Sequence, residues 1–258
     1  MRTLFRSTLG GWAAPLALLT LLALSAPARA DDTTVAVAAN FTEPAKEIAR
    51  AFEAQTGHTV TLSFGSTGQF YIQIKQDAPF AVLLAADQET PKKMGDDGLA
   101  VAETRFTYAI GRLVLWGKSP NAPAGEAILR SGGFDKLAVA NPKLAPYGAA
   151  GLQVLTKLGV YDALAPKLVQ GNNITQTFQF VDTGNAELGF VALSQVIART
   201  DGHYWLVPAG LYSPILQDAV LLRKGAGDPT ARAFLAFLKG PEALKIIQTF
   251  GYGIGAAD

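Results

Sequence analysis

The 258-residue chain has no cysteine and only two histidines, His58 and His203. Without cysteine it has no disulfide framework, no thiol nucleophile and no N-terminal cysteine for lipid modification. The histidines stand apart: His58 follows the expected end of a helix at Gly57, and His203 follows a turn-like Gly202. Neither belongs to a motif such as HExxH or GxSxG. We therefore expect two surface histidines, not bases or ligands of a bare metal cation.

Charge is also scarce, at 17% of the residues. The first 30 residues hold three of the 22 basic side chains, so the other 228 residues carry 19 basic and 21 acidic ones, a formal charge of −2. A nearly neutral chain without a basic cluster has no electrostatic footprint for nucleic acid or for a membrane surface. We expect neither as a partner.

The first thirty residues differ from the rest. Arg2 and Arg6 precede an apolar run over residues 12–24, and ARA at 28–30 has the small-x-small pattern of a cleavage site. This arrangement is typical of a secretory signal peptide. The alternative is a membrane anchor, but the run is shorter than the ~20 residues that a span needs. We expect residues 1–30 to be cleaved and the remainder to be a free exported domain.

Beyond residue 30, short apolar runs alternate with helical patterns. In the helix predicted at 43–57, Ala45, Ile48, Ala49 and Phe52 have the i, i+3, i+4, i+7 spacing of a buried face. This alternation predicts an α/β fold with parallel sheets and helices on both faces. Strands are predicted at 34–39, 58–64, 80–87, 112–118, 136–142, 186–194, 203–208 and 218–224, and further helices at 69–76, 152–160 and 230–250.

The period-two runs at 112–118 and 218–224 lack the strand-helix rhythm of their neighbours. We interpret them as crossings out of one lobe and back. The prediction is a discontinuous first lobe of residues 31–108 and 216–258 and a second lobe of residues 109–215.

Three of the predicted strands end in small and polar residues. The first runs into Ala39 and Asn40, the second into GSTG at 65–68, and the third into Asn141 and onward to Tyr147. In open α/β sheets ligands bind beyond the carboxyl ends of strands, where the first N–H groups of the following helices lack partners. Small residues let an anion approach this positive end of the helix dipole. The alternative is that Asn, Ser and Thr only cap helices.

Charged residues are nearly absent from these strand ends, where Glu43 and Lys143 are the exceptions. We expect Lys143 to be solvated. A protonated oxyanion needs an acceptor for its O–H, whereas a fully ionised one needs only donors. The composition therefore favours a dianion that carries no proton. GSTG is not a phosphate-binding P-loop, because the GxxxxGK[ST] spacing and its lysine are missing.

Carboxylates are the remaining candidates for enzyme chemistry. Asp87 follows a predicted strand, and Asp96 and Asp97 precede a glycine turn. At such positions carboxylates commonly cap a helix or bend the chain, so we expect structural roles for all three.

Taken together, several stretches resemble the periplasmic molybdate-binding proteins of ABC transporters. The resemblance extends over essentially the whole mature chain and implies a two-lobe periplasmic binding protein (type II) fold, each lobe a mostly parallel sheet flanked by helices. It further implies an oxyanion in the interlobe cleft and hinge closure around it. The most specific stretches are FGSTGQFYIQI, DAPFAVLLAAD, RFTYAIGRLVLW, NPKLAPYGAAGLQVLTKLG and AELGFVALSQV.

The resemblance also implies which residues contact the anion. Ala39 and Ile174 can offer only backbone groups, Asn40 can add its amide, and Tyr147 can add its phenol. In the Ser-Thr pair of GSTG, Thr67 is the expected contact. Some members place a tyrosine in the strand equivalent to GFVALSQ. Here Ala192 stands at that position, and we expect Tyr147 to replace the missing contact.

The expected function is the capture of molybdate, and of tungstate, by neutral hydrogen-bond donors, followed by delivery to an ABC permease in the inner membrane. We expect a periplasmic monomer without a cofactor. Sulfate, thiosulfate or another dianion is the alternative ligand, because cavity size alone would exclude sulfate. An exported hydrolase is a further alternative, although the sequence shows no nucleophile paired with a base. The signal peptide disfavours a regulatory ligand-sensing domain.

Overall fold

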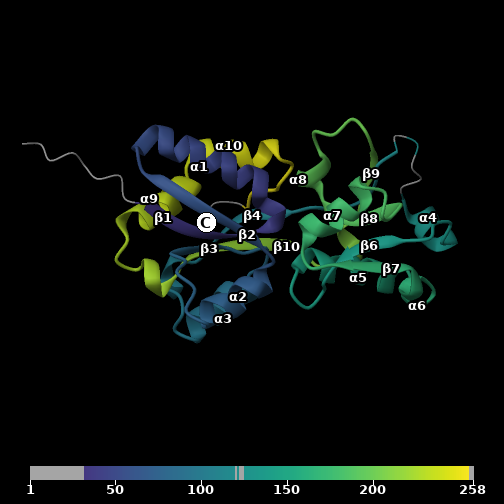
Figure 1. The fold of residues 1–258 in the computed structure, drawn as a ribbon, viewed down its shortest axis with the longest axis horizontal. Coiled ribbons are helices and arrows are strands. Elements are labelled where there is room, and N and C mark those ends of the chain that lie inside the picture. Colours follow the sequence, from purple (N-terminus) through teal and green to yellow (C-terminus); the bar gives the residue numbers. More distant parts are fainter. Residues whose placement is uncertain (1–31, 120, 122–124, 256–258) are drawn as a thin grey trace, which may run out of the picture.

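The computed structural model describes residues 32–119, 121 and 125–255, and the predicted signal peptide lies outside them. Within these residues ten strands form two five-stranded sheets. Figure 1 shows them as two lobes side by side, each with helices above and below its sheet. The two-lobe α/β fold expected from the sequence is therefore confirmed. No helix in the described part is both long and apolar enough to span a membrane.

The sheet of lobe 1 has the order β2-β1-β3-β10-β4. β1 pairs in parallel with β2 and β3, whereas β10 pairs antiparallel with β3 and β4. The strands are β1 (Asp32–Ala38), β2 (Thr59–Gly65), β3 (Val82–Leu84), β4 (Phe106–Gly111) and β10 (Ile215–Leu221). One face is covered by α1 (Thr42–Thr56), α9 (Pro229–Leu238) and α10 (Pro241–Thr249), and the other by α2 (Thr67–Lys75) and α3 (Glu89–Asp96).

The sheet of lobe 2 has the order β7-β6-β8-β5-β9. β6 pairs in parallel with β7 and β8, and β5 pairs antiparallel with β8 and β9. The strands are β5 (Leu113–Gly117), β6 (Leu137–Ala140), β7 (Leu168–Gly171), β8 (Leu188–Ala192) and β9 (His203–Leu206). The helices are α4 (Glu126–Ser131), α5 (Pro146–Lys157), α6 (Tyr161–Leu164), α7 (Ile174–Asp182) and α8 (Leu193–Val196).

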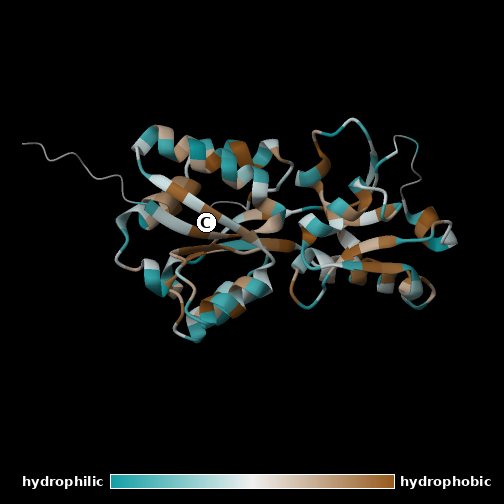
Figure 2. Ribbon diagram, viewed as in Figure 1, coloured by the Kyte–Doolittle hydropathy of each residue, from teal (hydrophilic) through white to brown (hydrophobic). Residues whose placement is uncertain are grey.

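The hydrophobic pattern explains why these elements pack as they do. In α1 the predicted face, Ala45, Ile48, Ala49 and Phe52, is buried in the core of lobe 1. Gly57 ends this helix with φ of 74°, a left-handed conformation that glycine adopts without a steric penalty. Figure 2 shows apolar strands inside each lobe and hydrophilic residues on the outward sides of the helices. Burial of these faces fixes each sheet between its helices.

Two predictions from the sequence differ from the structure. The helix predicted at 230–250 is two helices, α9 and α10, separated at Gly240, which is extended with φ of −77° and ψ of 162°. Pro241 follows, and a proline lacks the N–H and the space that a continuing helix needs. It therefore starts α10 instead.

The segments interpreted as crossings are strands inside the lobes. β5 lies wholly in the second sheet, and residues 218–221 lie in the first. The chain passes between the sheets at Arg112, between β4 and β5, and again between β9 and β10. In each sheet the strands next to these passages pair antiparallel, so half of the pairings are parallel and not most of them.

Candidate anion-binding site

A small cavity of ≈ 10 Å³ lies between the lobes. About that much space is needed to admit one water-sized sphere, so in this arrangement the lobes are nearly closed on the cavity. The walls come from residues at or directly after the carboxyl ends of strands β1, β2, β3, β6 and β7. They are Ala38, Ala39, Asn40, Gly65, Ser66, Thr67 and Ala86 of lobe 1 and Ala145, Pro146, Tyr147 and Ile174 of lobe 2.

The structure thus brings together all five residues selected from the sequence, although they are spread over positions 39 to 174. Ala39 forms a short 3₁₀ turn after β1, while Thr67, Tyr147 and Ile174 stand in the first turns of α2, α5 and α7. The backbone N–H groups of these four residues have no hydrogen-bond partner within the described part of the chain. Four donors and three helix dipoles therefore converge on the cavity, which suits an anion.

The hydroxyl groups of Ser66 and Thr67 differ in how they are used. Ser66 is 3% exposed, and its Oγ has no partner among the described residues. Thr67 Oγ1 accepts a hydrogen bond from the Ala86 N–H at 3.0 Å. Since a buried hydroxyl rarely stays unpaired, Ser66 is the stronger candidate for a ligand contact. The sequence had favoured Thr67 of the pair, and the orphaned hydroxyl of Ser66 becomes visible only in the structure.

The amide of Asn40 is directed differently from its predicted role. Both of its hydrogens are donated inside the protein, to Gln217 Oε1 at 2.9 Å and to Tyr252 Oη at 3.0 Å. An Asn amide has two hydrogens, so none remains for an anion. Asn40 lines the cavity, but the expectation that its side chain donates to the ligand is wrong for this arrangement.

The phenol of Tyr147 is similarly engaged. Its oxygen accepts from Gln217 Nε2 at 3.3 Å. Gly111 makes the space for it, because a Cβ on Gly111 would lie 2.2 Å from Tyr147 Oη. Burial raises the pKa of the Tyr147 phenol well above its usual value, and the phenol therefore stays protonated at neutral pH. Ala192, the position of the missing tyrosine, is buried and does not line the cavity.

The cavity has no charged side chain among the residues that line it. Lys143 is exposed, and Glu43 forms a surface ion pair with Lys46 at 2.8 Å. His203 is exposed, and His58 is half-buried with its ring stacked on Phe52. The described residues include no cluster of three or more His, Asp or Glu side chains that suits a metal ion. Neutral dipoles are thus what the cavity offers a ligand.

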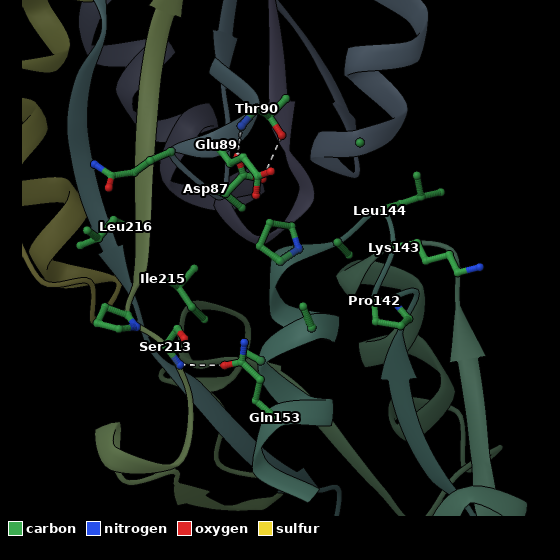
Figure 3. A pocket seen from close by; sticks show the side chains of 18 residues that line it. Asp87, Glu89, Thr90, Pro142, Lys143, Leu144, Gln153, Ser213, Ile215 and Leu216 are labelled. Atoms are coloured by element: carbon green, nitrogen blue, oxygen red, sulfur yellow. Dashed lines mark hydrogen bonds between the residues drawn. The ribbon is translucent and has the colours of Figure 1, made fainter. Parts of the chain in front are cut away.

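A larger groove of ≈ 490 Å³ adjoins the cavity between the lobes (Figure 3). Asp87 and Glu89 lie on its lobe 1 side. Asp87 accepts from the Thr90 N–H at 2.7 Å and so caps the start of α3, as predicted. Burial raises the pKa of Asp87, and the hydrogen bonds from Thr90 oppose this shift. Carboxylates repel a dianion, so the groove is a poorer anion site than the cavity.

The lobes are in direct contact around the cavity. The Gly68 N–H at the start of α2 donates to the Leu144 carbonyl of lobe 2 at 2.9 Å. Ser194 Oγ of lobe 2 donates to the Asn40 carbonyl of lobe 1 at 2.8 Å. These bonds hold a closed arrangement of the two lobes.

Comparison with known proteins bears on this geometry. Residues 33–253 match the family model described as bacterial extracellular solute-binding protein. The chain belongs to this family. The family's description as solute-binding agrees with a cavity lined by hydrogen-bond donors.

Individual relatives of this solute-binding protein are similar over most of its length. The molybdate-binding protein ModA of Rhodobacter capsulatus is 54% identical over 97% of this chain and 98% of its own. The solved periplasmic molybdate-binding protein of Azotobacter vinelandii superposes with a TM-score of 0.84 at 40% identity, covering 86% of this chain and 99% of that one. The sulfate-binding protein SubI of Mycobacterium tuberculosis, at 12% identity and a TM-score of 0.75, covers 86% of each chain and shares the fold alone.

Proposed function

We propose that this protein is a periplasmic receptor that captures molybdate, and also tungstate, and delivers it to an ABC permease. The observation that carries the proposal is the uncharged cavity between the lobes, on which unpartnered backbone N–H groups and the free Ser66 hydroxyl converge. The 54% identical molybdate-binding relative supports the choice of anion. We further propose that the protein works as a monomer without a cofactor.

The chemistry of the cavity explains how such an anion is held. A fully ionised tetrahedral oxyanion has acceptors only, so each donor that points inward gains a charge-assisted hydrogen bond. The assigned ligand residues are Ala39 and Ile174 through their N–H groups, Ser66 and Thr67 through hydroxyl and backbone, Asn40 through its backbone, and Tyr147. Residues 1–30 act as a cleaved export signal in this proposal. The lobe bounds predicted from the sequence, residues 31–108 and 216–258 for lobe 1 and residues 109–215 for lobe 2, fall within β4 and at the start of β10. We propose that the chain passes between the lobes at Arg112 and just before Ile215 instead.

Sulfate is the second candidate, because it has the same charge and shape as molybdate. The two differ in radius, so the size of the closed cavity decides between them. A receptor of this kind keeps the larger anion by matching the distance between its lobes to it.

A thermal-shift series on the anion-free protein from residue 31 onward tests the proposal. Molybdate, tungstate, sulfate, thiosulfate and phosphate are added separately. A ligand at ~100 times its Kd stabilises the folded state by about 2.7 kcal/mol, which raises Tm by several degrees. We expect shifts with molybdate and tungstate only. A shift with sulfate alone would mean that sulfate, not molybdate, is the ligand. No shift with any anion would refute the receptor function.

A further inference from the structure

Gln217 lies at the centre of a buried polar cluster beside the anion site. It is 0% exposed on β10, next to an irregularity in the pairing of β10 with β4. Its Oε1 accepts from Asn40 Nδ2 at 2.9 Å and from Tyr108 Oη at 3.1 Å. Its Nε2 donates to Tyr147 Oη at 3.3 Å. A single amide therefore bonds to Asn40 in lobe 1 and to Tyr147 in lobe 2, and both of these residues line the cavity.

The orientation of this amide is determined by its neighbours. The Asn40 amide donates to Gln217 Oε1, and the single hydrogen of the Tyr108 hydroxyl is shared between this oxygen and the Ala85 carbonyl at 3.0 Å, so the Gln217 amide nitrogen faces Tyr147. Tyr252 is the other hydroxyl in the cluster. It accepts from Asn40 Nδ2 at 3.0 Å and donates to the Asn40 carbonyl at 2.7 Å. These bonds leave Gln217 as the donor to the Tyr147 phenol.

The approach of Tyr147 to Gln217 depends on a notch in β4. A Cβ on Gly111 would lie 2.2 Å from Tyr147 Oη and 2.8 Å from Gln217 Nε2. The glycine thus lets a phenol from lobe 2 enter the sheet of lobe 1. Tyr147 also stands in the first turn of α5, whose free N–H groups face the anion site. A bond that holds its side chain therefore holds this end of α5 as well.

We propose that Gln217 is a positioning residue that sets the selectivity of the anion site. By tying Asn40 to Tyr147 it fixes how far apart the lobe 1 and lobe 2 halves of the cavity lie. The inference rests on the proposed function. Molybdate and sulfate have equal charge and shape, so the distance between the two halves is what separates them. In this proposal the spacing that Gln217 holds matches molybdate, so loosening it weakens the binding of molybdate more than that of sulfate.

The test measures the Kd of molybdate and of sulfate by isothermal titration calorimetry in Gln217→Met, Tyr147→Phe and the double variant. We expect each single variant to weaken molybdate about threefold to tenfold, the loss of one buried hydrogen bond, with a smaller change for sulfate. The ratio of the two Kd values therefore moves toward one. Gln217→Met also removes the acceptor of Asn40 and Tyr108. The bond between Gln217 and Tyr147 is lost in all three variants, so the two single losses should not add in the double variant.

Gln88→Met is the matched control. Gln88 also donates hydrogen bonds beside β10, to Thr107 at 2.9 Å and Asp218 at 3.2 Å, but it does not line the cavity. In Gln88→Met the ratio of the Kd values for molybdate and sulfate should equal that of the wild type. If Gln217→Met does not fold, Gln217→Glu keeps the acceptor for Asn40 and Tyr108 and removes only the donor. Its added charge opposes both dianions alike, so the ratio remains a valid measure.

The outcomes separate this inference from the function on which it rests. An unchanged Kd ratio in the Gln217 variants, or additive losses in the double variant, would overturn the positioning role while wild-type binding of molybdate stands. A wild type that binds no molybdate in the same titration would overturn the proposed function itself.

Discussion

At the scale of single residues, the side chains around the cavity divide into those that are free and those that are already bonded. The Ser66 hydroxyl is free, the Thr67 hydroxyl supports the Ala86 N–H, and the Asn40 amide is fully used by Gln217 and Tyr252. A free buried donor costs stability in the empty protein and regains it when a ligand accepts its hydrogen. This difference predicts distinct behaviour for substitutions at adjacent positions.

Ser66→Ala should weaken anion binding and leave the empty protein at least as stable as before. The lost bond is to a charged group and contributes about 1.5–3 kcal/mol, whereas no protein partner of Ser66 Oγ is lost. Calorimetry gives the binding loss and urea unfolding gives the stability. Ser131→Ala, at an exposed serine, is the control. Unchanged affinity in Ser66→Ala would remove Ser66 from the site.

Thr67→Val should lower both the affinity for the anion and the free energy of unfolding of the empty protein. The substitution removes the acceptor of the buried Ala86 N–H, and an unsatisfied buried donor costs about 1–3 kcal/mol of unfolding free energy. Calorimetry again measures the affinity, and urea unfolding measures the stability. A loss of stability with full retention of affinity would show that Thr67 only supports the loop and does not contact the anion.

At the scale of elements, the start of α2 lies directly against the opposite lobe. A Cβ on Gly68 would lie 2.9 Å from both Cα and Cδ2 of Leu144. The bond from the Gly68 N–H to the Leu144 carbonyl spans the two lobes at 2.9 Å. Absence of a side chain at Gly68 is therefore a condition for this contact between the lobes, and we expect that a form with the lobes apart does not need it.

Gly68→Ala should have opposite effects on the empty and the loaded protein. Alanine favours a helix over glycine by about 1 kcal/mol, so the empty protein should be at least as stable. The clash with Leu144 in the closed form should cost about 1–3 kcal/mol of binding free energy.

Stopped-flow dissociation of molybdate should show this loss as faster release. Gly227→Ala, where nothing lies within 4 Å of an added Cβ, controls for the glycine substitution. Release at the wild-type rate would mean that closure does not depend on this contact.

At the scale of the whole molecule, the polar cluster around Gln217, where the lobes meet, includes the buried phenols of Tyr108, Tyr147 and Tyr252. Burial raises the pKa of Tyr108 and Tyr147 well above 10.0 and that of Tyr252 to about 12. In the unfolded chain these phenols ionise near their ordinary pKa of 10.0. The unfolded state therefore releases protons first as the pH rises, and alkaline conditions favour it.

The contribution of these phenols to the free energy of unfolding should not vary with pH below pH 10, and it should fall as the pH rises above 10. Each phenol contributes up to about 1.4 kcal/mol per pH unit between its unfolded and folded pKa values. Urea unfolding at several alkaline pH values measures the slope, and Tyr147→Phe should reduce it by one phenol. A slope that Tyr147→Phe leaves unchanged would contradict the burial of this group in the folded state.

Local sequence patterns determined the α/β class and the uncharged strand ends. The family resemblance implied the five residues Ala39, Asn40, Thr67, Tyr147 and Ile174, which line the cavity. Periodicity reports burial, and small residues before a helix report a free N-terminus, so both features are readable within a few positions. The family resemblance then indicated which of the strand ends meet. The same local view joined α9 to α10 and mistook β5 for a crossing.

Only the tertiary structure decided which donors are free. Asn40 bonds to Gln217 and Tyr252, which lie 177 and 212 positions further along the chain. Gly111 admits the Tyr147 phenol to the same cluster. A residue's type states what it can donate, but its partner is fixed by folding, because a hydrogen bond requires two groups within about 3 Å of each other. The sequence alone therefore determined what kind of ligand the cavity suits, and the packing of the lobes determined which atoms are left to hold it.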